Sequence, residues 1–205
     1  MRTLGSAPIL GPLHDAAKNG DLEQLKQLLD QGTDIEEQDR IVGTALHWAA
    51  LTDNAEVAQA LIAAGADVNS VARGDGTTAL HVAAPRGSTE VAAALIEAGA
   101  NINARNREGR TPLHIAAASN ASGAIELLVR SGVDIDEKLR GGATPLSFAV
   151  FAGQVDAVRT LLKLGADVNG APDVDPVFPS TPLKLAIASG LKEIADILRA
   201  AGATE

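Results

Sequence analysis

A seven-residue motif returns six times along the chain, and this repetition limits the possible folds more than any other feature. Its clearest copies read TALHWAA from Thr44 and TPLHIAA from Thr111, and all six copies keep the leucine at the third position. These marker leucines stand at positions 13, 46, 80, 113, 146 and 183, at intervals of 33, 34, 33, 33 and 37 residues. A unit of this size cannot bury its apolar face alone, so such units stack on their neighbours. The sequence therefore predicts a solenoid.

The residues around each motif predict two short helices followed by an extended arm. Threonine before the motif is a favoured N-cap, and proline is tolerated in the first helical turn. Residues that accept a left-handed backbone, such as Gly20 and Asn120, follow each first helix. A second run of apolar residues at helical spacing then ends at a glycine, and an arm such as Ala66–Asn69 comes next. The predicted fold class is all-α.

The composition favours closely packed helices and a protein partner. Hydrophobic residues make up 46% of the 205 residues, but aromatic residues make up only 2%. Alanine and the aliphatic residues must therefore fill the core, and alanine has the highest intrinsic helix propensity. The net charge of -9 disfavours binding to a phosphate backbone.

Several kinds of site and segment are missing from the sequence. There is no cysteine, which excludes disulfides and zinc–thiolate sites. No run approaches the 18 apolar residues of a membrane span, and the first residues lack the apolar stretch of a secretory signal. We expect a cytoplasmic protein.

Four histidines occupy the same motif position in successive units, which raises the question of a metal or catalytic site. Packed helices lie about 8–10 Å apart, whereas a zinc ion holds its nitrogens at about 2.0–2.1 Å, so these side chains cannot share a metal. The four histidines are His14, His47, His81 and His114. Phosphate-loop and nucleophile-elbow motifs are absent. The carboxylate pair Asp134 and Asp136 recurs as Asp or Asn in other units, as a turn device would. We expect no enzyme activity, no metal and no cofactor.

In its period, its motif and its glycine-ended arm, the chain resembles the ankyrin-repeat family over about residues 8 to 203. The resemblance implies an all-α ankyrin-repeat solenoid of helix-turn-helix pairs with short extended hairpin loops. It also implies that the motif histidines are structural and hydrogen-bond backbone in the neighbouring turn. Polar residues in the first and last units predict end caps, so we expect one complete domain over residues 1–205. Its six repeats cover approximately residues 8–38, 39–72, 73–105, 106–138, 139–175 and 176–205.

Three features depart from the regular repeat. Pro85 stands near the end of an inner helix, where its ring conflicts with the carbonyl of His81, so that helix should be shortened or bent. Gly123 weakens the fourth outer helix by about 1 kcal/mol relative to alanine. The link at residues 170–180 is four residues longer than its counterparts and contains three prolines. Its apolar residues, Val174, Val177 and Phe178, either fold back onto the last repeat or contact a partner.

Ankyrin-repeat proteins usually bind partners with their hairpin tips and the exposed face of their inner helices. Carried over by register, this implies a protein–protein interaction module, namely an adaptor, scaffold or inhibitor. Several arginines, including Arg73 and Arg105, fall in the hairpins, and arginine suits bidentate contacts to carboxylates. We expect a partner protein with acidic groups around an apolar anchor, and a monomer when free. The predicted contact residues are Arg40, Ile41, Leu51, Asp75, Arg86, Arg107, Glu108, Arg110, Arg140, Phe151 and Phe178.

Other interpretations of the arginine-rich edge stay open. The arginines could bind nucleic acid or another polyanion, although the net charge and the scarcity of aromatic residues disfavour this. They could also serve only to keep the hairpin tips soluble. The link at residues 170–180 could instead mediate self-association.

Overall fold

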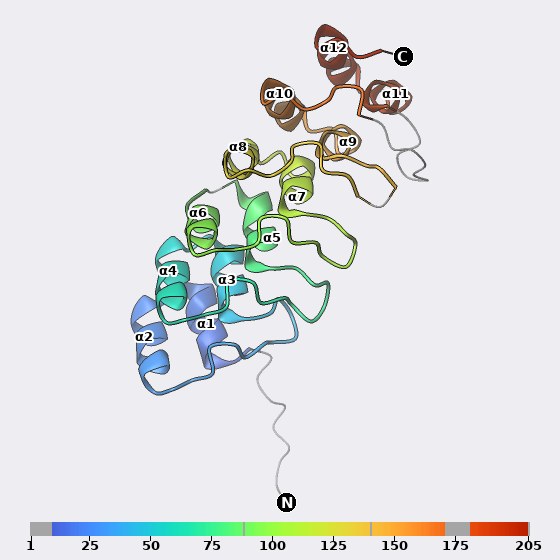
Figure 1. Cartoon of the computed structure of the whole chain (residues 1–205). Coiled ribbons are helices and arrows are strands. Elements are labelled where there is room, and N and C mark those ends of the chain that lie inside the picture. The colour runs from blue at the N-terminus through green and yellow to red at the C-terminus, as the bar shows by residue number, and fades with distance from the viewer. Residues whose placement is uncertain (1–9, 88, 140, 171–180, 205) are drawn as a thin grey trace, which may run out of the picture.

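The computed structural model describes residues 10–87, 89–139, 141–170 and 181–204, and over these residues it is a stack of helix pairs (Figure 1). Odd-numbered helices pack on one another as an inner row, and even-numbered helices form an outer row. The elements are α1 (Pro12–Asn19), α2 (Leu22–Asp30), α3 (Ala45–Thr52), α4 (Ala55–Ala63), α5 (Ala79–Ala83), the 3-10 turn η1 (Ala84–Arg86), α6 (Thr89–Glu97), α7 (Pro112–Ala118), α8 (Ser122–Arg130), α9 (Pro145–Phe151), α10 (Val155–Lys163), α11 (Pro182–Ala188) and α12 (Lys192–Ala200). The predicted all-α solenoid is confirmed. Each predicted repeat contains one pair, while the repeat boundaries themselves stay a prediction.

The helix ends lie where the sequence predicts them. Thr44, Thr78 and Thr111 precede inner helices, and each forms a capping box with the histidine three residues later. Left-handed residues separate the two helices of each pair, and a left-handed glycine follows each outer helix. The first group is Gly20, Asp53, Gly87, Asn120, Gly153 and Gly190, and the second is Gly32, Gly65, Gly99, Gly132, Gly165 and Gly202.

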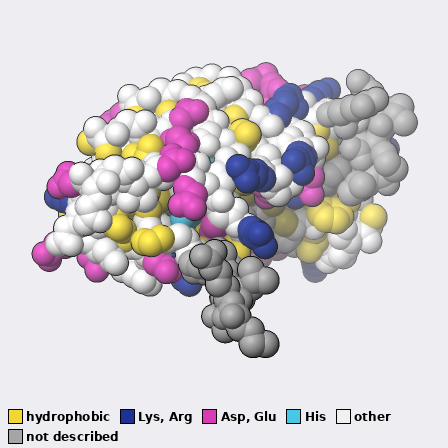
Figure 2. All heavy atoms as spheres, turned by 90° about the horizontal axis from the view of Figure 1, so that it is seen from below, with side chains coloured by type: hydrophobic (Ala, Val, Ile, Leu, Met, Phe, Trp, Pro, Cys, Tyr) yellow, Lys and Arg dark blue, Asp and Glu magenta, His cyan; other side chains and the backbone are white. Residues whose placement is uncertain are grey.

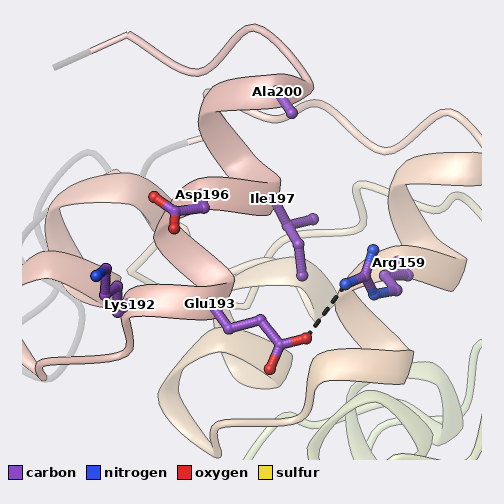
Figure 3. Close-up of a pocket in the computed structure, with 6 residues that line it drawn as sticks. All are labelled: Arg159, Lys192, Glu193, Asp196, Ile197 and Ala200. Atoms are coloured by element: carbon purple, nitrogen blue, oxygen red, sulfur yellow. Dashed lines mark hydrogen bonds and ion pairs between the residues drawn. The ribbon is translucent and has the colours of Figure 1, made fainter.

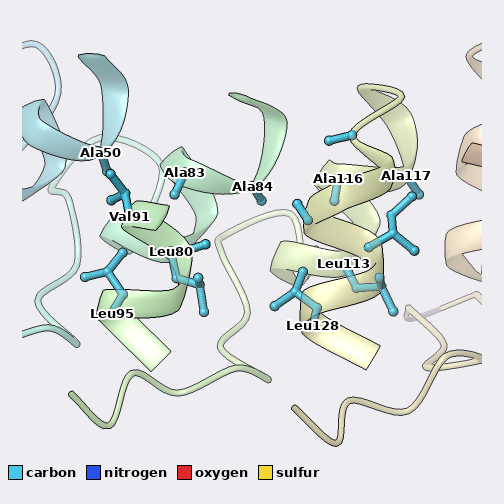
Figure 4. Packing of buried hydrophobic residues seen from close by; sticks show 14 of the residues in the cluster. Ala50, Leu80, Ala83, Ala84, Val91, Leu95, Leu113, Ala116, Ala117 and Leu128 are labelled. Atoms are coloured by element: carbon cyan, nitrogen blue, oxygen red, sulfur yellow. The ribbon is translucent and has the colours of Figure 1, made fainter. Parts of the chain in front are cut away.

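The core between the two rows consists mainly of leucine and alanine (Figure 4). Leu95 and Leu113 are fully buried, and Ala83 and Ala116 are no more than 2% exposed. These alanines lie where one inner helix meets the next, and their small side chains let the helices approach closely. Each outer helix has nine residues, whereas the inner helices have five to eight. The hairpins between repeats project to one side, alongside this shorter inner row (Figure 1).

Pro85 shortens its helix as predicted. α5 ends at Ala83, and residues Ala84–Arg86 continue as the 3-10 turn η1. The pyrrolidine ring has no N–H to donate and excludes the α-helical position of the carbonyl four residues earlier. The third repeat therefore has the shortest inner helix.

Close packing explains why glycine stands at position 123 in spite of its low helix propensity. A Cβ at this position would lie 3.2 Å from Cγ2 of Thr89 and 3.3 Å from the carbonyl oxygen of Gly87. Because the second of these atoms belongs to the backbone, it cannot move aside as a flexible side chain could. The close approach of α8 to the preceding turn therefore offsets much of what alanine would gain in helix propensity.

The motif histidines join successive repeats, which confirms their structural role. His47 Nδ1 lies 2.8 Å from Thr44 Oγ1, and its Nε2 lies 3.1 Å from the carbonyl oxygen of Thr77 in the next hairpin. His81 and His114 repeat this arrangement one and two units further on. A carbonyl can only accept a hydrogen bond, so Nε2 carries the proton and Nδ1 accepts from the threonine. In the fifth repeat Ser147 takes the histidine position and contacts Thr144 Oγ1 at 3.2 Å.

The acidic and amide residues of the arms are turn devices, as predicted. Asp67 and Asp134 each accept a hydrogen bond from the backbone N–H two residues later. The next polar residue along the arm reaches the following repeat, as where Asn69 Oδ1 accepts from the N–H of Asn101 at 2.7 Å. These side chains therefore fold each arm and connect it to its neighbour.

His14 differs from the other three histidines because Gly11 stands where they have threonine. Its Nδ1 is buried and has no hydrogen-bond partner within the described part of the chain. The backbone of Gly11 (φ -74°, ψ 161°) matches that of Thr44 (φ -79°, ψ 171°), so serine would cause no backbone strain there. A new Cβ would lie 3.0 Å from Glu37 Oε2, which ends a flexible side chain, and 3.0 Å from His14 Nδ1, so the ring would shift by a few tenths of an ångström.

We therefore expect Gly11→Ser to raise the free energy of unfolding by about 0.5–1 kcal/mol, through a helix cap and a satisfied ring nitrogen. Urea denaturation at pH 7.5 measures the change. Thr44→Gly removes the equivalent contact one repeat later and should lower the same quantity. A loss in Thr44→Gly without a gain in Gly11→Ser would contradict the explanation for His14.

Candidate functional site

A groove lies between two neighbouring hairpins and the inner helices α3 and α5. Its volume is about 630 Å³, and its walls are the second hairpin (residues 38–43) and the third hairpin (residues 71–78). Leu51 and Val82 are half-buried on the helices that line it, while Arg40 and Ile41 are exposed on the second hairpin. Ile41 is 59% exposed. The lining residues are Gln38, Asp39, Arg40, Ile41, Val42, Gly43, Leu51, Ala72, Arg73, Gly74, Asp75, Thr77 and Val82.

The second hairpin is held in shape by Asp39. Its Oδ1 accepts hydrogen bonds from the backbone N–H groups of Ile41, Val42 and Gly43 at 2.8–2.9 Å. Its Oδ2 accepts from Nε1–H of Trp48 on α3. Partial burial raises the pKa of Asp39, but these hydrogen bonds outweigh it and hold the pKa below its usual range. The carboxylate is thus charged at neutral pH, and its oxygens already bind the chain's own donors.

The third hairpin is held from both neighbouring repeats. Gln38 Nε2 donates to the carbonyl of Val71 at 2.9 Å, and Gln38 Oε1 accepts from the N–H of Arg73 at 3.1 Å. From the other side, Arg107 Nη2 donates to the carbonyl of Arg73 at 2.8 Å, and its Nη1 donates to the carbonyl of Gly74. The N–H of Arg107 also donates to the carbonyl of Asp75 at 2.9 Å. The third hairpin is therefore a fixed wall of the groove.

Asp75 lies at the tip of the third hairpin, and one oxygen of its carboxylate already accepts hydrogen bonds within the chain. Its Oδ1 accepts from the hydroxyl of Thr77 at 2.7 Å and from the N–H of Thr77 at 3.0 Å. Burial raises the pKa of Asp75, but the hydrogen bonds from Thr77 outweigh it, so the net shift is downward. This side chain stays anionic beside the groove.

The arginine-rich edge consists of two groups with different surroundings. Arg105 pairs with Glu137, and Arg110 lies 3.0 Å from Glu108 and 5.2 Å from the centre of the Phe148 ring. Arg107 binds the third hairpin. Within the described residues, the guanidinium groups of Arg40, Arg73 and Arg86 form no hydrogen bond or ion pair. Seen from below, several Lys and Arg side chains lie together to the right of centre, on the side toward which the hairpins point (Figure 2).

The groove brings together only some of the predicted contact residues. Arg40, Ile41, Leu51 and Asp75 line it. Arg86 and Phe151 are exposed but lie outside its lining, with Phe151 at 56% exposure on α9. Contacts within the chain engage Arg107, Glu108 and Arg110. Arg140, Phe178 and the link at residues 171–180 lie outside the described residues.

Arg73 and Val82 are among the groove residues that sequence reasoning did not select as contacts. Val82 follows its marker leucine by two positions, where the second repeat has Trp48 and the fifth has Phe148. Trp48 and Phe148 are buried, whereas Val82 is half-exposed beside the hairpins. Arg73 stands seven residues before its marker leucine, where the second and fourth repeats have the turn residues Asp39 and Asn106. The replacement of a turn residue by arginine is the signal that could have identified it.

A second hollow, of about 610 Å³, lies on the outer row between α10 and α12 (Figure 3). Arg159 pairs with Glu193 at 3.2 Å across it, and Lys192 and Asp196 complete two charges of each sign. The guanidinium group of Arg159 is already paired with Glu193, whereas those of Arg40 and Arg73 in the first groove form no hydrogen bond or ion pair within the described residues. In the parts of the chain that are described, no three His, Cys, Asp or Glu side chains are placed to hold a metal ion. None of the described helices is long and apolar enough to span a membrane.

A family model described as ankyrin repeats (3 copies) matches residues 13–106 and 103–171, which together cover more than half of the chain. The chain belongs to the ankyrin-repeat family. Its fold is similar to the crystal structure of the ankyrin repeat domain of Bcl-3, described as a unique member of the IkappaB protein family. That match has a TM-score of 0.81 and 30% identity, and covers 95% of this chain and 87% of the other. The human ASB11 ankyrin repeat domain matches with a TM-score of 0.84 and 33% identity, over 95% and 85% of the two chains.

One curated relative carries the name of an enzyme. The palmitoyltransferase AKR1 of Naumovozyma castellii is 42% identical over 67 residues, which are 32% of this chain and 9% of that protein. The chain therefore spans a small part of this relative's length, and the activity in the name is that of the whole relative. Ankyrin repeats are generally protein–protein interaction modules, and the fold is typically non-enzymatic.

Proposed function

We propose that this ankyrin-repeat chain is a non-enzymatic binding module, an adaptor, scaffold or inhibitor, that holds another protein in the groove between its second and third hairpins. The observation that carries the proposal is the groove itself. One hollow of about 630 Å³ combines the groove arginines, Arg40 and Arg73, with the apolar side chains of Ile41, Leu51 and Val82. A recess in which apolar side chains lie beside convergent polar groups is a typical binding site.

The chemistry of the groove favours a partner segment that carries a carboxylate next to a bulky apolar residue. A guanidinium group binds a carboxylate through two parallel hydrogen bonds. Leu51 and Val82 are half-buried and can cover an apolar side chain from one side. Asp39 and Asp75 are anionic as well, but both oxygens of Asp39 and one oxygen of Asp75 already accept hydrogen bonds within the chain, whereas the guanidinium groups of the groove arginines form none within the described residues. The cytoplasmic location and the monomeric free state stay predictions.

Binding of nucleic acid or another polyanion is less well supported. Such binding needs several cations arranged along one track. Arg105, Arg107 and Arg110 are engaged by groups of the chain itself, which interrupts the track along the hairpins. The net charge of -9 acts against it as well.

We expect the double variant Arg40→Glu and Arg73→Glu to lose its protein partner. Both side chains are exposed, so the fold should tolerate the change. Proteins captured from an extract of the source cells by wild type and variant are quantified by mass spectrometry, and the affinity of the main captured protein is then measured by calorimetry. A loss of about tenfold to a hundredfold is expected from two reversed charges at an interface.

The matched control is Arg130→Glu and Lys163→Glu on the outer helices α8 and α10. It changes the net charge by the same amount on exposed residues away from the groove. This control should keep the affinity of the wild type. If groove variant and control bind the captured protein equally, the groove is not the binding site.

A further inference from the structure

We infer that Arg107 is a positioning residue, which together with Gln38 holds the third hairpin as the wall of the groove and does not itself contact the partner. Only the consequence for binding rests on the proposed function. The hairpin contacts are properties of the free chain, and they concern a residue for which the sequence predicts partner contact.

Arg107 places three donors on three consecutive carbonyl groups. Its guanidinium donates to the carbonyls of Arg73 and Gly74, and its backbone N–H donates to the carbonyl of Asp75. The planar guanidinium presents its donors in a fixed fork, which matches two adjacent acceptors better than the single ammonium of lysine does. In addition, Cγ of Arg107 would lie 3.2 Å from a Cβ placed on Gly76. The side chain therefore lies against the tip of the hairpin.

Gln38 holds the same hairpin from the opposite side. Its amide accepts from the N–H of Arg73 and donates to the carbonyl of Val71. The two backbone polar groups of Arg73 are thus bonded to side chains from the two neighbouring repeats: its N–H to Gln38 and its carbonyl to Arg107. With its backbone fixed at both ends, Arg73 has its guanidinium left to line the groove.

The role belongs to Arg107 itself, because motif position alone does not determine it. Arg40 stands six residues before its marker leucine, as Arg107 does. Arg40 lines the groove and donates to no described residue, whereas Arg107 is absent from the groove lining and binds the hairpin. This pair supplies a matched comparison between a contact arginine and a positioning arginine.

The effect on binding follows from preorganisation. A hairpin that is already ordered loses less conformational freedom when a partner settles against it. Without this clamp, which the side chains of Arg107 and Gln38 form on the third hairpin, residues 73–76 would have to be ordered during binding. We expect the affinity to fall about tenfold, which is the effect of immobilising one or two further side chains.

The test compares Arg107→Gln, Arg107→Lys and the control Arg40→Gln. Nuclear magnetic resonance relaxation of the Gly74 and Gly76 amides measures the mobility of the third hairpin in the free protein. Both Arg107 variants should increase this mobility and leave the thermal midpoint nearly unchanged, while Arg40→Gln should leave the hairpin as rigid as in wild type. Unchanged mobility in Arg107→Gln would overturn the inference, whatever the partner is.

A second readout uses a defined probe, the peptide acetyl-Glu-Leu-Glu-Leu-amide, titrated while the signals of Arg40 and Arg73 are followed. Lysine keeps the charge of Arg107 but not its fork, so Arg107→Lys should weaken binding as much as Arg107→Gln does. If lysine preserves the wild-type affinity, Arg107 acts through its charge and the positioning role is wrong. If the wild type does not bind the peptide while the hairpin loosens in both variants, the clamp stands and the proposed partner chemistry fails.

Discussion

Lowering the pH from 7.5 to 5 should reduce the free energy of unfolding by about 2 kcal/mol through His114 alone. This side chain is fully buried, and its Nε2–H donates to the carbonyl of Ala143. Burial, together with the charges of Arg105 and Arg110, lowers the pKa of His114 from 6.5 to about 4. Its ring also packs edge-on against Phe148, with 5.3 Å between ring centres. These surroundings disfavour the protonated, charged form of the His114 ring.

The direction of the effect follows from where the proton binds. Above pH 6.5 the imidazole is neutral in both states, so its contribution to stability is complete. Between pH 6.5 and about 4 the unfolded chain takes up a proton that the folded chain refuses, and stability is lost as the pH falls. Burial lowers the pKa of His47 and His81 as well, and they act in the same direction. Burial and nearby carboxylates raise the pKa of Asp136, which acts in the opposite direction at the acidic end of this range.

Urea denaturation at pH 7.5, 6.5, 5.5 and 5 measures this dependence, and the variant His114→Gln isolates the share of one histidine. The variant loses the contacts of the ring and should be less stable than wild type at pH 7.5. Between pH 7.5 and 5, however, its stability should fall by about 2 kcal/mol less than that of wild type. Parallel curves for the two proteins would show that His114 is not the group that titrates.

Leu113→Ala should destabilise the protein by about 2–5 kcal/mol, the largest effect of a single substitution that we predict. Leu113 is the marker leucine of the fourth repeat, and none of its surface is exposed. It lies in the core cluster together with Leu128 of α8 (Figure 4). The surrounding alanine side chains are too short to move into the space that the leucine leaves, so the cavity would stay open.

The control for this substitution is Ile41→Ala in the second hairpin. Ile41 is similar in size, but it is 59% exposed. We expect a change within about 0.5 kcal/mol. Thermal and urea denaturation of both variants provide the comparison, and equal losses would mean that the repeats do not share one packed core. Ile41→Ala also removes apolar surface from the groove, so it should weaken partner binding without affecting the fold.

The fold could be predicted from the sequence because the features that define each repeat act locally. Threonine caps, left-handed turns and the proline at position 85 act within a few residues of themselves, and six copies confirm one another. The role of the histidines was predictable for the same reason, since the rings of His47, His81 and His114 each meet the carbonyl of the next copy.

The candidate site was predictable only in part, because the partner of an exposed arginine depends on residues one repeat away. Register places Arg40 and Arg107 alike, yet Arg107 finds the carbonyls of the third hairpin and Arg40 does not. Similarly, Arg105 and Glu137 meet across 32 residues of sequence. Long side chains have many rotamers, and no periodic pattern selects among them. The sequence therefore located the edge of the solenoid that carries the site, whereas the structure was needed to identify which arginines line the groove.

The hydrogen bond between Trp48 and Asp39 connects a fluorescent side chain to the second hairpin, which is one wall of the groove. The chain contains one tryptophan and no tyrosine, so a single indole dominates its near-ultraviolet emission. That indole is 6% exposed, donates to the carboxylate that shapes the second hairpin, and lies 5.3 Å from the ammonium of Lys18. A partner that displaces the second hairpin would change the polarity around this one fluorophore. Movement of the second hairpin on binding can therefore be followed on the unlabelled protein.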